Sequence, residues 1–383
     1  MTATSQLTSL GSIDATMIRG GTSRGVFLRE ADLPPEGELR DALIVELMGS
    51  PDPLQLNGVG GGKSHLSKVM IVDPSDRPDA DVDYTFGQVS VTEPDVDWTR
   101  NNGNVGSAIG SFAILDGIVP AAEPVTELTL YNTNTDTYVD QKVPTVDGEP
   151  AVYGDYAIHG VPGTGAKIET TFREPGGGVT GSLLPMGERV TTFEVDGREL
   201  EASVVDAGTL GVSFRAADLG LAGTELPEEL AANADVLETI ETVRDEIRAE
   251  LGLEHAKRSN PSAAIVSEPQ SYDCSDDGRV EAADVDVTVR FISLQPHHAA
   301  SLTGGMSLST ATRIPGTIPN EFVADTSGTS VRLGHPKGTT TIDADVTGDP
   351  EPHVAGLTYW RTMCPVFRGQ VYNRYQGGLE SLR

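Results

Sequence analysis

The segment Asn57–Val72, NGVGGGKSHLSKVMIV, holds two lysines beside a run of glycines. Residues 62–64 match the closing half of the phosphate-binding loop G-x-x-x-x-G-K-[ST], but Asn57 stands where its first glycine belongs. Such a loop also needs a helix directly after it, because the helix N-terminus binds the phosphate. The β-branched residues after Ser64 and the Asp-Pro pair that follows them predict a strand instead. The sequence therefore argues against a nucleotide hydrolase of this kind.

Lys68 lies where this glycine loop enters the predicted strand. Its amine either extends to solvent from the edge of a sheet or lies in a dry cleft. Desolvation in a cleft lowers the pKa of an amine, so that part of it is neutral and basic near pH 7. The local sequence leaves both readings open. Lys63 is expected to face solvent or the rim of a cleft.

The segment Met17–Gly25, MIRGGTSRG, places two arginines around a Gly-Gly-Thr-Ser turn. Gly20 and Gly21 would make a plain hairpin, which is the structural alternative. The arginines could instead bind carboxylates, while the two hydroxyls donate hydrogen bonds. The candidate site residues of this segment are Arg19, Gly21, Thr22, Ser23 and Arg24.

Two predicted helices begin in segments that suit an anion. Asn101, Asn102, Gly103 and Asn104 precede the first, and the segment LTGGM at 302–306 precedes the second. One asparagine can act as an ordinary N-cap, whereas several polar residues around a glycine also suit an anion at the helix N-terminus. The candidate binding residues are Asn102, Gly103, Asn104, Thr303, Gly304 and Gly305.

Histidines and cysteines give weaker signals. The adjacent His297 and His298 would point to opposite faces of a strand, so that at most one enters a site, and His298 is the candidate. His335 is expected in a turn. The two cysteines, Cys274 and Cys364, are far apart and lack metal-ligand spacing, so neither a disulfide nor a metal site is predicted.

Short β-branched runs dominate the elements that must position these residues. Strands are predicted at 15–21, 23–29, 67–73, 82–91, 127–135, 202–208, 263–269 and 284–294. An apolar pattern with helical spacing predicts a buried helix at 104–119, and an amphipathic pattern predicts a surface helix at 234–251. A third helix is predicted to start after residues 302–305 and to end before Pro315.

The 383 residues therefore suit two domains, each rich in strands and each with one central apolar helix. The seam is expected near residues 178–190, which gives domains at 1–184 and 185–383, with the last segment able to pack back on the first domain. The fold class is α+β, with two related domains and a cleft between them.

The net charge of −30 and the pI of about 4.4 restrict the classes of partner that the protein can bind. So acidic a surface repels nucleic acid and anionic lipid. The dispersed charge is typical of a protein from a high-salt cytoplasm, where screening shortens like-charge repulsion. The N-terminus lacks the basic flank and apolar core of a signal peptide, and no apolar run approaches the length of a membrane span, so a cytoplasmic protein is expected.

Taken in order along nearly the whole chain, these segments resemble the PrpF family, a branch of the diaminopimelate-epimerase-like fold. That family includes 2-methylaconitate cis-trans isomerase, 4-oxalomesaconate tautomerase and methylitaconate isomerase. The segments that carry the resemblance are MIRGGTSRGVFL, GGGKSHLSKVMIV, NNGNVGSAIGSFAILDGIV, VTGSLLPMG, VVDAG, HHAASLTGG, IPGT and LGHPKG.

The resemblance implies two β-rich domains around central helices, with the active site between them, and proton transfer without a cofactor. It places the functional lysine and serine of the family on Lys68, as base and then acid, and on Ser23, as donor or proton relay. The arginine and helix-terminal groups would stabilise a dienolate-like charge as it forms.

Three departures from the family pattern bear on the mechanism and on the substrate. Asn102 stands where many relatives have cysteine, which excludes a two-cysteine racemase. Ser262 stands where relatives commonly have lysine, and Thr209-Leu210 replaces an Asn-Pro pair.

The predicted function is an isomerase that shifts a proton in an unsaturated di- or tricarboxylate, most similar to 2-methylaconitate cis-trans isomerase. The alternatives are a 4-oxalomesaconate tautomerase and a carboxylate-binding accessory protein of an aconitase-type dehydratase. The expected partner is the small-molecule substrate, and a homodimer is compatible with the sequence.

Overall fold

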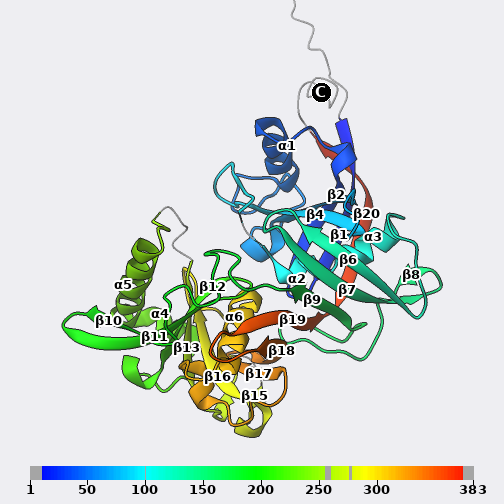
Figure 1. Ribbon diagram of the computed structural model, residues 1–383. Coiled ribbons are helices and arrows are strands. Elements are labelled where there is room, and N and C mark those ends of the chain that lie inside the picture. Colours follow the sequence, from blue (N-terminus) through cyan, green and yellow to red (C-terminus); the bar gives the residue numbers. More distant parts are fainter. Residues whose placement is uncertain (1–10, 100, 255–259, 276–277, 374–383) are drawn as a thin grey trace, which may run out of the picture. The chain divides into compact units, whose positions relative to one another are not determined.

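The computed structural model describes residues 11–99, 101–254, 260–275 and 278–373. The chain divides into two compact units. Unit 1 contains the described parts of Met1–Ala157, Gly163–Thr170 and Arg361–Arg383, and unit 2 contains those of Ile158–Pro162 and Thr171–Trp360. The boundary expected from the sequence, between residues 184 and 185, lies inside unit 2. Figure 1 labels the elements of both units.

Unit 1 is built on a mixed sheet. Its strands pair in the order β20-β1-β2-β3-β4-β6-β7. The long strands are β1 (Gly11–Gly20), β2 (Ser23–Arg29), β3 (Lys68–Pro74), β4 (Val82–Val89), β6 (Val125–Asn132), β7 (Thr137–Val146) and β20 (Met363–Asn373). The shorter ones are β5 (Val96–Asp97), β8 (Glu149–Pro150) and β9 (Ile168–Arg173), which leaves unit 1 after Thr170. The helices are η1 (Glu30–Asp32), α1 (Glu38–Met48), η2 (Ser64–Leu66), α2 (Gly103–Gly106) and α3 (Ile109–Leu115).

Helices α1 and α3 lie on opposite faces of this sheet (Figure 1). Alternate residues of a strand point to opposite faces. Val26 and Val69 belong to the apolar cluster that includes α1, whereas the ring centre of Phe27 lies 5.3 Å from that of Phe112 in α3. Odd-numbered residues of β2 therefore face α2 and α3, and this face carries the candidate site.

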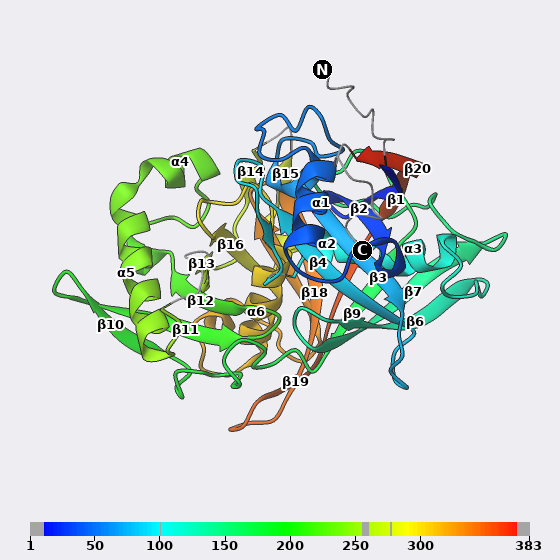
Figure 2. The ribbon, with the colours of Figure 1, turned by 90° about the horizontal axis from the view of Figure 1, so that it is seen from above.

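Unit 2 has its own mixed sheet, in which the strands pair in the order β10-β11-β12-β13-β16-β17-β18-β19. The strands are β10 (Thr191–Val195), β11 (Arg198–Asp206), β12 (Leu210–Arg215), β13 (Ser262–Ser267), β16 (Val287–Ile292), β17 (Ser330–His335), β18 (Gly338–Thr347) and β19 (His353–Arg361), with a small hairpin of β14 (Tyr272–Asp273) and β15 (Arg279–Val280). The helices are η3 (Ala217–Leu219), α4 (Pro227–Ala232), α5 (Ala234–Glu250), η4 (Ala282–Asp284), α6 (Leu302–Arg313) and η5 (Pro319–Phe322). Figure 2 shows α5 and α6 on opposite faces of β11, β12 and β13.

The two units repeat one sequence of strand pairings. In unit 1, β1–β2 is antiparallel, β2–β3 parallel, β3–β4 antiparallel, β4–β6 parallel and β6–β7 antiparallel. In unit 2 the same alternation runs through β11–β12, β12–β13, β13–β16, β16–β17 and β17–β18. Lys68, the first residue of β3, and Ser262, the first residue of β13, therefore hold equivalent positions.

Some elements differ from the sequence-based expectation. The helix expected at 104–119 is two short helices, α2 and α3, and α6 already starts at Leu302, because the hydroxyl of Ser301 accepts from Gly304 N and caps it there. Helix α1 was not predicted, because the nearly continuous apolar run from Ala42 to Met48, interrupted only by Glu46, gives no clear amphipathic pattern. Within the described residues, no helix has the length and apolar character needed to cross a membrane.

Candidate functional site

Lys68 begins β3 as a buried residue, with only 4% of its surface exposed. Its Nζ lies 2.5 Å from Oε1 of Gln88 and 5.3 Å from the ring centre of Phe86, both on β4. Of the two readings left open by the sequence, the extended solvent-facing lysine is wrong. The side chain is held inside unit 1, shielded from most of the solvent.

Ser23 lies on the same sheet face as Lys68. The parallel β2–β3 register pairs Val26 with Val69, the residues that follow Gly25 and Lys68, and a Cβ on Gly25 would be 3.4 Å from Lys68 Cβ and 3.0 Å from Val105 of α2. Ser23, two residues earlier on β2, points to the same face as Gly25. It is buried, and its hydroxyl makes no hydrogen bond to any residue in the described ranges. That hydroxyl is thus available to a ligand.

Gly20, the last residue of β1, and Gly21, in the turn that follows, pack against the start of α2. A Cβ on Gly20 would be 2.6 Å from the Asn104 carbonyl oxygen, and one on Gly21 would be 2.3 Å from Asn104 Oδ1. Gly21 also has a φ of +53°, which favours glycine. The hairpin of β1 and β2 is therefore real, and its two glycines allow the Thr22-Ser23 pair to approach the helix.

The two candidate arginines differ in what they bind. Arg19 Nη1 donates to the carbonyl oxygens of Gly21, at 3.0 Å, and of Thr362, at 2.9 Å, and burial lowers the pKa of its guanidinium. Arg24 points to the face of β2 opposite to Ser23, and its Nη2 would be 3.1 Å from a Cβ on Gly61 in the glycine loop. The buried Nε of Arg24 has no hydrogen-bond partner among the described residues. Arg19 therefore binds backbone carbonyl groups, whereas Arg24 has one N–H donor, at Nε, that could bind a ligand.

The polar residues ahead of α2 bind mainly within unit 1. Asn102 Oδ1 accepts from Val105 N at 3.0 Å and caps the helix, and Asn101 Oδ1 accepts from Asn102 N at 2.7 Å. Asn104 Oδ1 accepts from Arg361 Nε at 2.9 Å and from Thr22 N at 3.4 Å. Asn102 thus caps α2, Asn104 contacts Thr22 from within the helix, and the side-chain oxygens of all three asparagines are used within the protein.

Positive charge gathers around the glycine loop in an otherwise acidic chain. The pKa of His65 is lowered, first by partial desolvation of its ring and then by the charges of Lys63, Lys68 and Arg24. Lys63 is exposed, as expected. Lys63, Lys68 and Arg24 are called the cationic cluster below. Their side chains give unit 1 a local positive potential that suits a ligand with several carboxylates.

The equivalent place in unit 2 holds a hydroxyl. Ser262 Oγ is buried and has no hydrogen-bond partner among the described residues, and a Cβ on Gly304 would be 3.0 Å from it. Ser301 caps α6 by accepting from Gly304 N at 3.3 Å, and Gly305 N donates to the Ser301 carbonyl oxygen at 2.7 Å. Thr303 is partly exposed in the first turn. The start of α6 thus meets one unused buried donor.

The histidines lie differently from the expectation. Neither His297 nor His298 is in a strand, because β16 ends at Ile292 and the chain then turns, with one isolated bridge at Pro296. His298 is exposed, with Nδ1 3.8 Å from Glu228 Oε1. His335 is buried at the end of β17 instead of lying in the turn, so that expectation was wrong.

Gln88 and Arg361 contact Lys68 and Asn104, respectively, and the sequence analysis did not predict either contact. Gln88 reaches Lys68 through the β3–β4 register, and Arg361 follows Asn104 by 257 positions. No motif marks either residue. An antiparallel pairing of the predicted strands 67–73 and 82–91 was the signal that could have brought Gln88 to Lys68.

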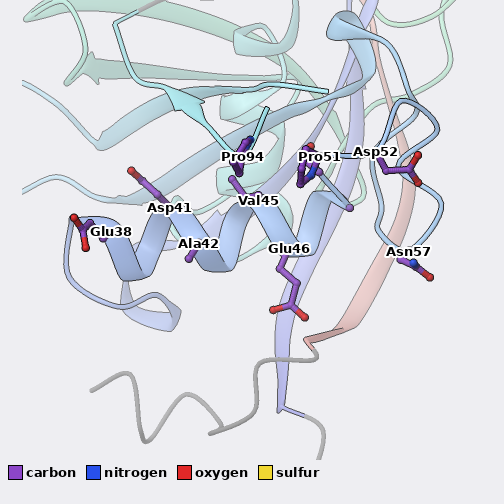
Figure 3. A pocket seen from close by; sticks show the side chains of 11 residues that line it. Glu38, Asp41, Ala42, Val45, Glu46, Pro51, Asp52, Asn57 and Pro94 are labelled. Carbon is purple, nitrogen blue, oxygen red and sulfur yellow. The ribbon is translucent and has the colours of Figure 1, made fainter. Parts of the chain in front are cut away.

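A cavity of about 600 Å³ lies elsewhere on unit 1, beside α1 (Figure 3). Its lining includes Glu38, Asp41, Glu46 and Asp52 and none of the candidate site residues. Carboxylates repel an anionic ligand, so this cavity does not suit a polycarboxylate. Both cysteines are free thiols, and the described residues contain no group of three or more His, Cys, Asp or Glu side chains able to hold a metal ion.

Comparison with known proteins identifies relatives over nearly the whole chain. Residues 11–374 match the family model described as PrpF protein. The chain is 37% identical to 3-methylitaconate isomerase of Eubacterium barkeri, over 94% of this chain and 97% of the relative. It is 37% identical to 2-methyl-aconitate isomerase of Shewanella oneidensis, over 87% and 89%. A crystal structure of methylitaconate-delta-isomerase superposes with a TM-score of 0.86 at 34% identity, over 98% of this chain and 97% of that chain.

Proposed function

The chain belongs to the PrpF family, and on this premise we propose that it is an isomerase that moves a proton across the allylic system of an unsaturated di- or tricarboxylate. The observation that carries the proposal is the buried Lys68 amine on the same sheet face as the unbonded hydroxyl of Ser23. Relatives named as isomerases of methylitaconate and of 2-methylaconitate support the substrate class.

In the proposed reaction, neutral Lys68 removes a proton from the carbon next to the double bond. The electron pair of that C–H bond spreads over the double bond and the conjugated carboxylate as a dienolate. The Lys68 ammonium then returns a proton to the far carbon of the allylic unit, or to the original carbon after rotation, so no atom is gained or lost. One group serves as base and then as acid, which favours a pKa near the working pH.

The other groups stabilise charge. Ser23 donates a hydrogen bond to the developing dienolate, and the other two members of the cationic cluster, Lys63 and Arg24, bind the carboxylates. The first turn of α6, with Thr303, Gly304 and Gly305, and the Ser262 hydroxyl offer further donors from unit 2. A substrate that binds between the two domains, and a reaction that needs no cofactor, are parts of this proposal.

Within the class, 2-methylaconitate is the proposed substrate, and methylitaconate and 4-oxalomesaconate are the comparison substrates. The test follows proton exchange and isomerisation of each compound in deuterated water by NMR. Lys68→Ala should lose at least 10²-fold of the exchange rate, in line with general acid–base catalysis. Lys142→Ala removes an exposed lysine paired with Glu169 at 2.9 Å and should retain the wild-type rate.

The second candidate is the carboxylate-binding accessory protein. It is favoured by Asn102, whose side chain caps α2 at the position where many relatives have cysteine. A rise in the melting temperature with one of the three compounds, without proton exchange in any of them, would support it. Exchange in Lys68→Ala at the wild-type rate would remove Lys68 from the mechanism.

A further inference from the structure

The side chain of Gln88 has its amide group fixed at both ends. Its Nε2 donates to the carbonyl oxygens of Ser67, at 2.9 Å, of Ser64, at 3.1 Å, and of Val89, at 3.3 Å. Its Oε1 accepts from Lys68 Nζ at 2.5 Å. Lys68 and Gln88 are direct partners in the antiparallel β3–β4 register.

Only one orientation of this amide satisfies its surroundings. Turned by 180°, the Gln88 oxygen would meet three carbonyl oxygens, and its NH₂ group would meet the donor hydrogens of Lys68. The carbonyls of Ser64 and Ser67 come from η2 and its C-cap, directly before β3. The turn that follows the glycine loop therefore aims the Gln88 oxygen at the amine.

We propose that Gln88 is a positioning residue for the reaction, which holds the Lys68 amine through a neutral acceptor and sets the direction of its lone pair. The proposal rests on the function proposed above only in so far as Lys68 is the base. A neutral amine has two N–H groups and one lone pair. With one N–H directed at Gln88 Oε1, the lone pair and the second N–H occupy the two remaining positions, both directed away from Gln88.

A neutral acceptor also limits how strongly the ammonium form is stabilised. A carboxylate at the same place would interact with a full charge and hold the proton on the amine. The amide oxygen interacts through a dipole, so it stabilises the ammonium form less than a carboxylate would.

The Lys68 amine also interacts with charged groups, in addition to the neutral amide of Gln88. Lys68 lowers the pKa of His65, so a protonated His65 on η2 in turn favours the neutral amine, and Lys63 on the glycine loop and Arg24 on β2 act on the same imidazole. Asp97 on β5 lies opposite Gln88 in the β4–β5 register and favours the ammonium form. The Phe86 ring also favours the cation. Variants of Gln88 change the contacts of this side chain and leave these charged groups in place.

The test reads the protonation of Lys68 directly and needs no substrate. The chain has only six lysines, so protein labelled with ¹³C at lysine Cε gives few NMR signals, and Lys68→Arg identifies the one from Lys68. In Gln88→Glu the pKa of Lys68 should rise by about 1–3 units, because an opposite charge now contacts the amine. In Gln88→Met it should fall, because a hydrogen bond to the charged form is lost.

Gln370→Glu is the matched control, since it adds the same charge to exposed Gln370 on β20 and should leave the Lys68 titration unchanged. Opposite shifts in the two Gln88 variants support the positioning role, which a purely structural role would not produce. An unchanged pKa of Lys68 in Gln88→Met overturns the positioning role. This result decides the question even if Gln88→Glu does not fold.

Kinetics separate this proposal from the proposed function. If Lys68 is the base, the acidic limb of the pH–rate profile should move by the same amount as the Lys68 titration. If the pKa of Lys68 shifts while the acidic limb of the pH–rate profile stays in place, the Gln88 contact is supported and Lys68 is not the base.

Discussion

Nε of Arg361 donates a hydrogen bond of 2.9 Å to Oδ1 of Asn104, and the two residues are 257 positions apart in the chain. Arg361 is the residue at which the chain re-enters unit 1, and it is buried. The same oxygen of Asn104 accepts from Thr22 N at 3.4 Å. One amide thus joins the start of α2, the Thr22-Ser23 turn and the returning C-terminal segment.

Asn104→Ala should therefore destabilise unit 1. Loss of the shared acceptor leaves a charged donor in Arg361 without this partner, which costs about 1–3 kcal/mol in the free energy of unfolding. Urea unfolding followed by Trp98 fluorescence in a Trp360→Phe background measures it, because Trp98 lies in unit 1. Asn104→Asp keeps the oxygen and should lose less. Equal losses in both variants would contradict the shared-acceptor role.

Local sequence predicted the parts of the fold whose cause is local. The hairpin of β1 and β2 follows from β-branched runs around Gly20-Gly21, and β3 follows from the residues after Ser64. Lys68 was recognised because a charged residue entered an apolar strand. These signals depend on neighbours in the chain, so a single sequence contains them.

The remaining contacts depend on register and on distant segments. Gln88 is an ordinary polar residue of β4 until the β3–β4 register places it beside Lys68. Arg361 acts on Asn104 only after the chain has completed unit 2. The strand expected around His297 fails because Ile292 ends β16 and a turn follows, which the apolar run from 284 to 294 did not indicate. Pairing partners, not propensity, decide each case.

Gly21→Ala should destabilise the protein more than Gly148→Ala. Both glycines have positive φ, +53° and +77°, so each substitution costs about 1 kcal/mol in backbone strain. A Cβ on Gly148 meets nothing within 4 Å, whereas one on Gly21 would be 2.3 Å from Asn104 Oδ1. The difference between their unfolding free energies isolates the steric contact. Equal values would show that the turn moves away from α2 at no cost.

Arg24→Met should separate ligand binding from stability. The buried Nε of Arg24 lacks a partner among the described residues, and an unsatisfied buried donor costs free energy in the unliganded protein. The variant should keep the wild-type melting temperature or exceed it without ligand, and should lose most of the rise that 2-methylaconitate produces. A full ligand-induced rise would exclude Arg24 from carboxylate binding.

His297 should make unit 2 less stable as the pH falls. Its ring is desolvated and lies near His298, and both effects lower its pKa below the ordinary 6.5. As the pH falls below 6.5, the unfolded chain binds a proton that the folded protein refuses, so the free energy of unfolding decreases. The decrease continues until the pH reaches the lowered pKa of the folded state, where both states are protonated.

Trp360 lies in unit 2, so its fluorescence in a Trp98→Phe background reports the unfolding of that unit. Between pH 7.5 and 5.5, the urea midpoint of the parent should fall further than that of His297→Gln, in which an amide can still bond Ser293 Oγ, the present partner of His297 at 2.8 Å. His298→Gln removes the exposed neighbour and should keep most of the decrease, because desolvation is the larger cause of the lowered pKa of His297. If His297→Gln keeps the whole decrease, other groups cause the acid sensitivity of unit 2.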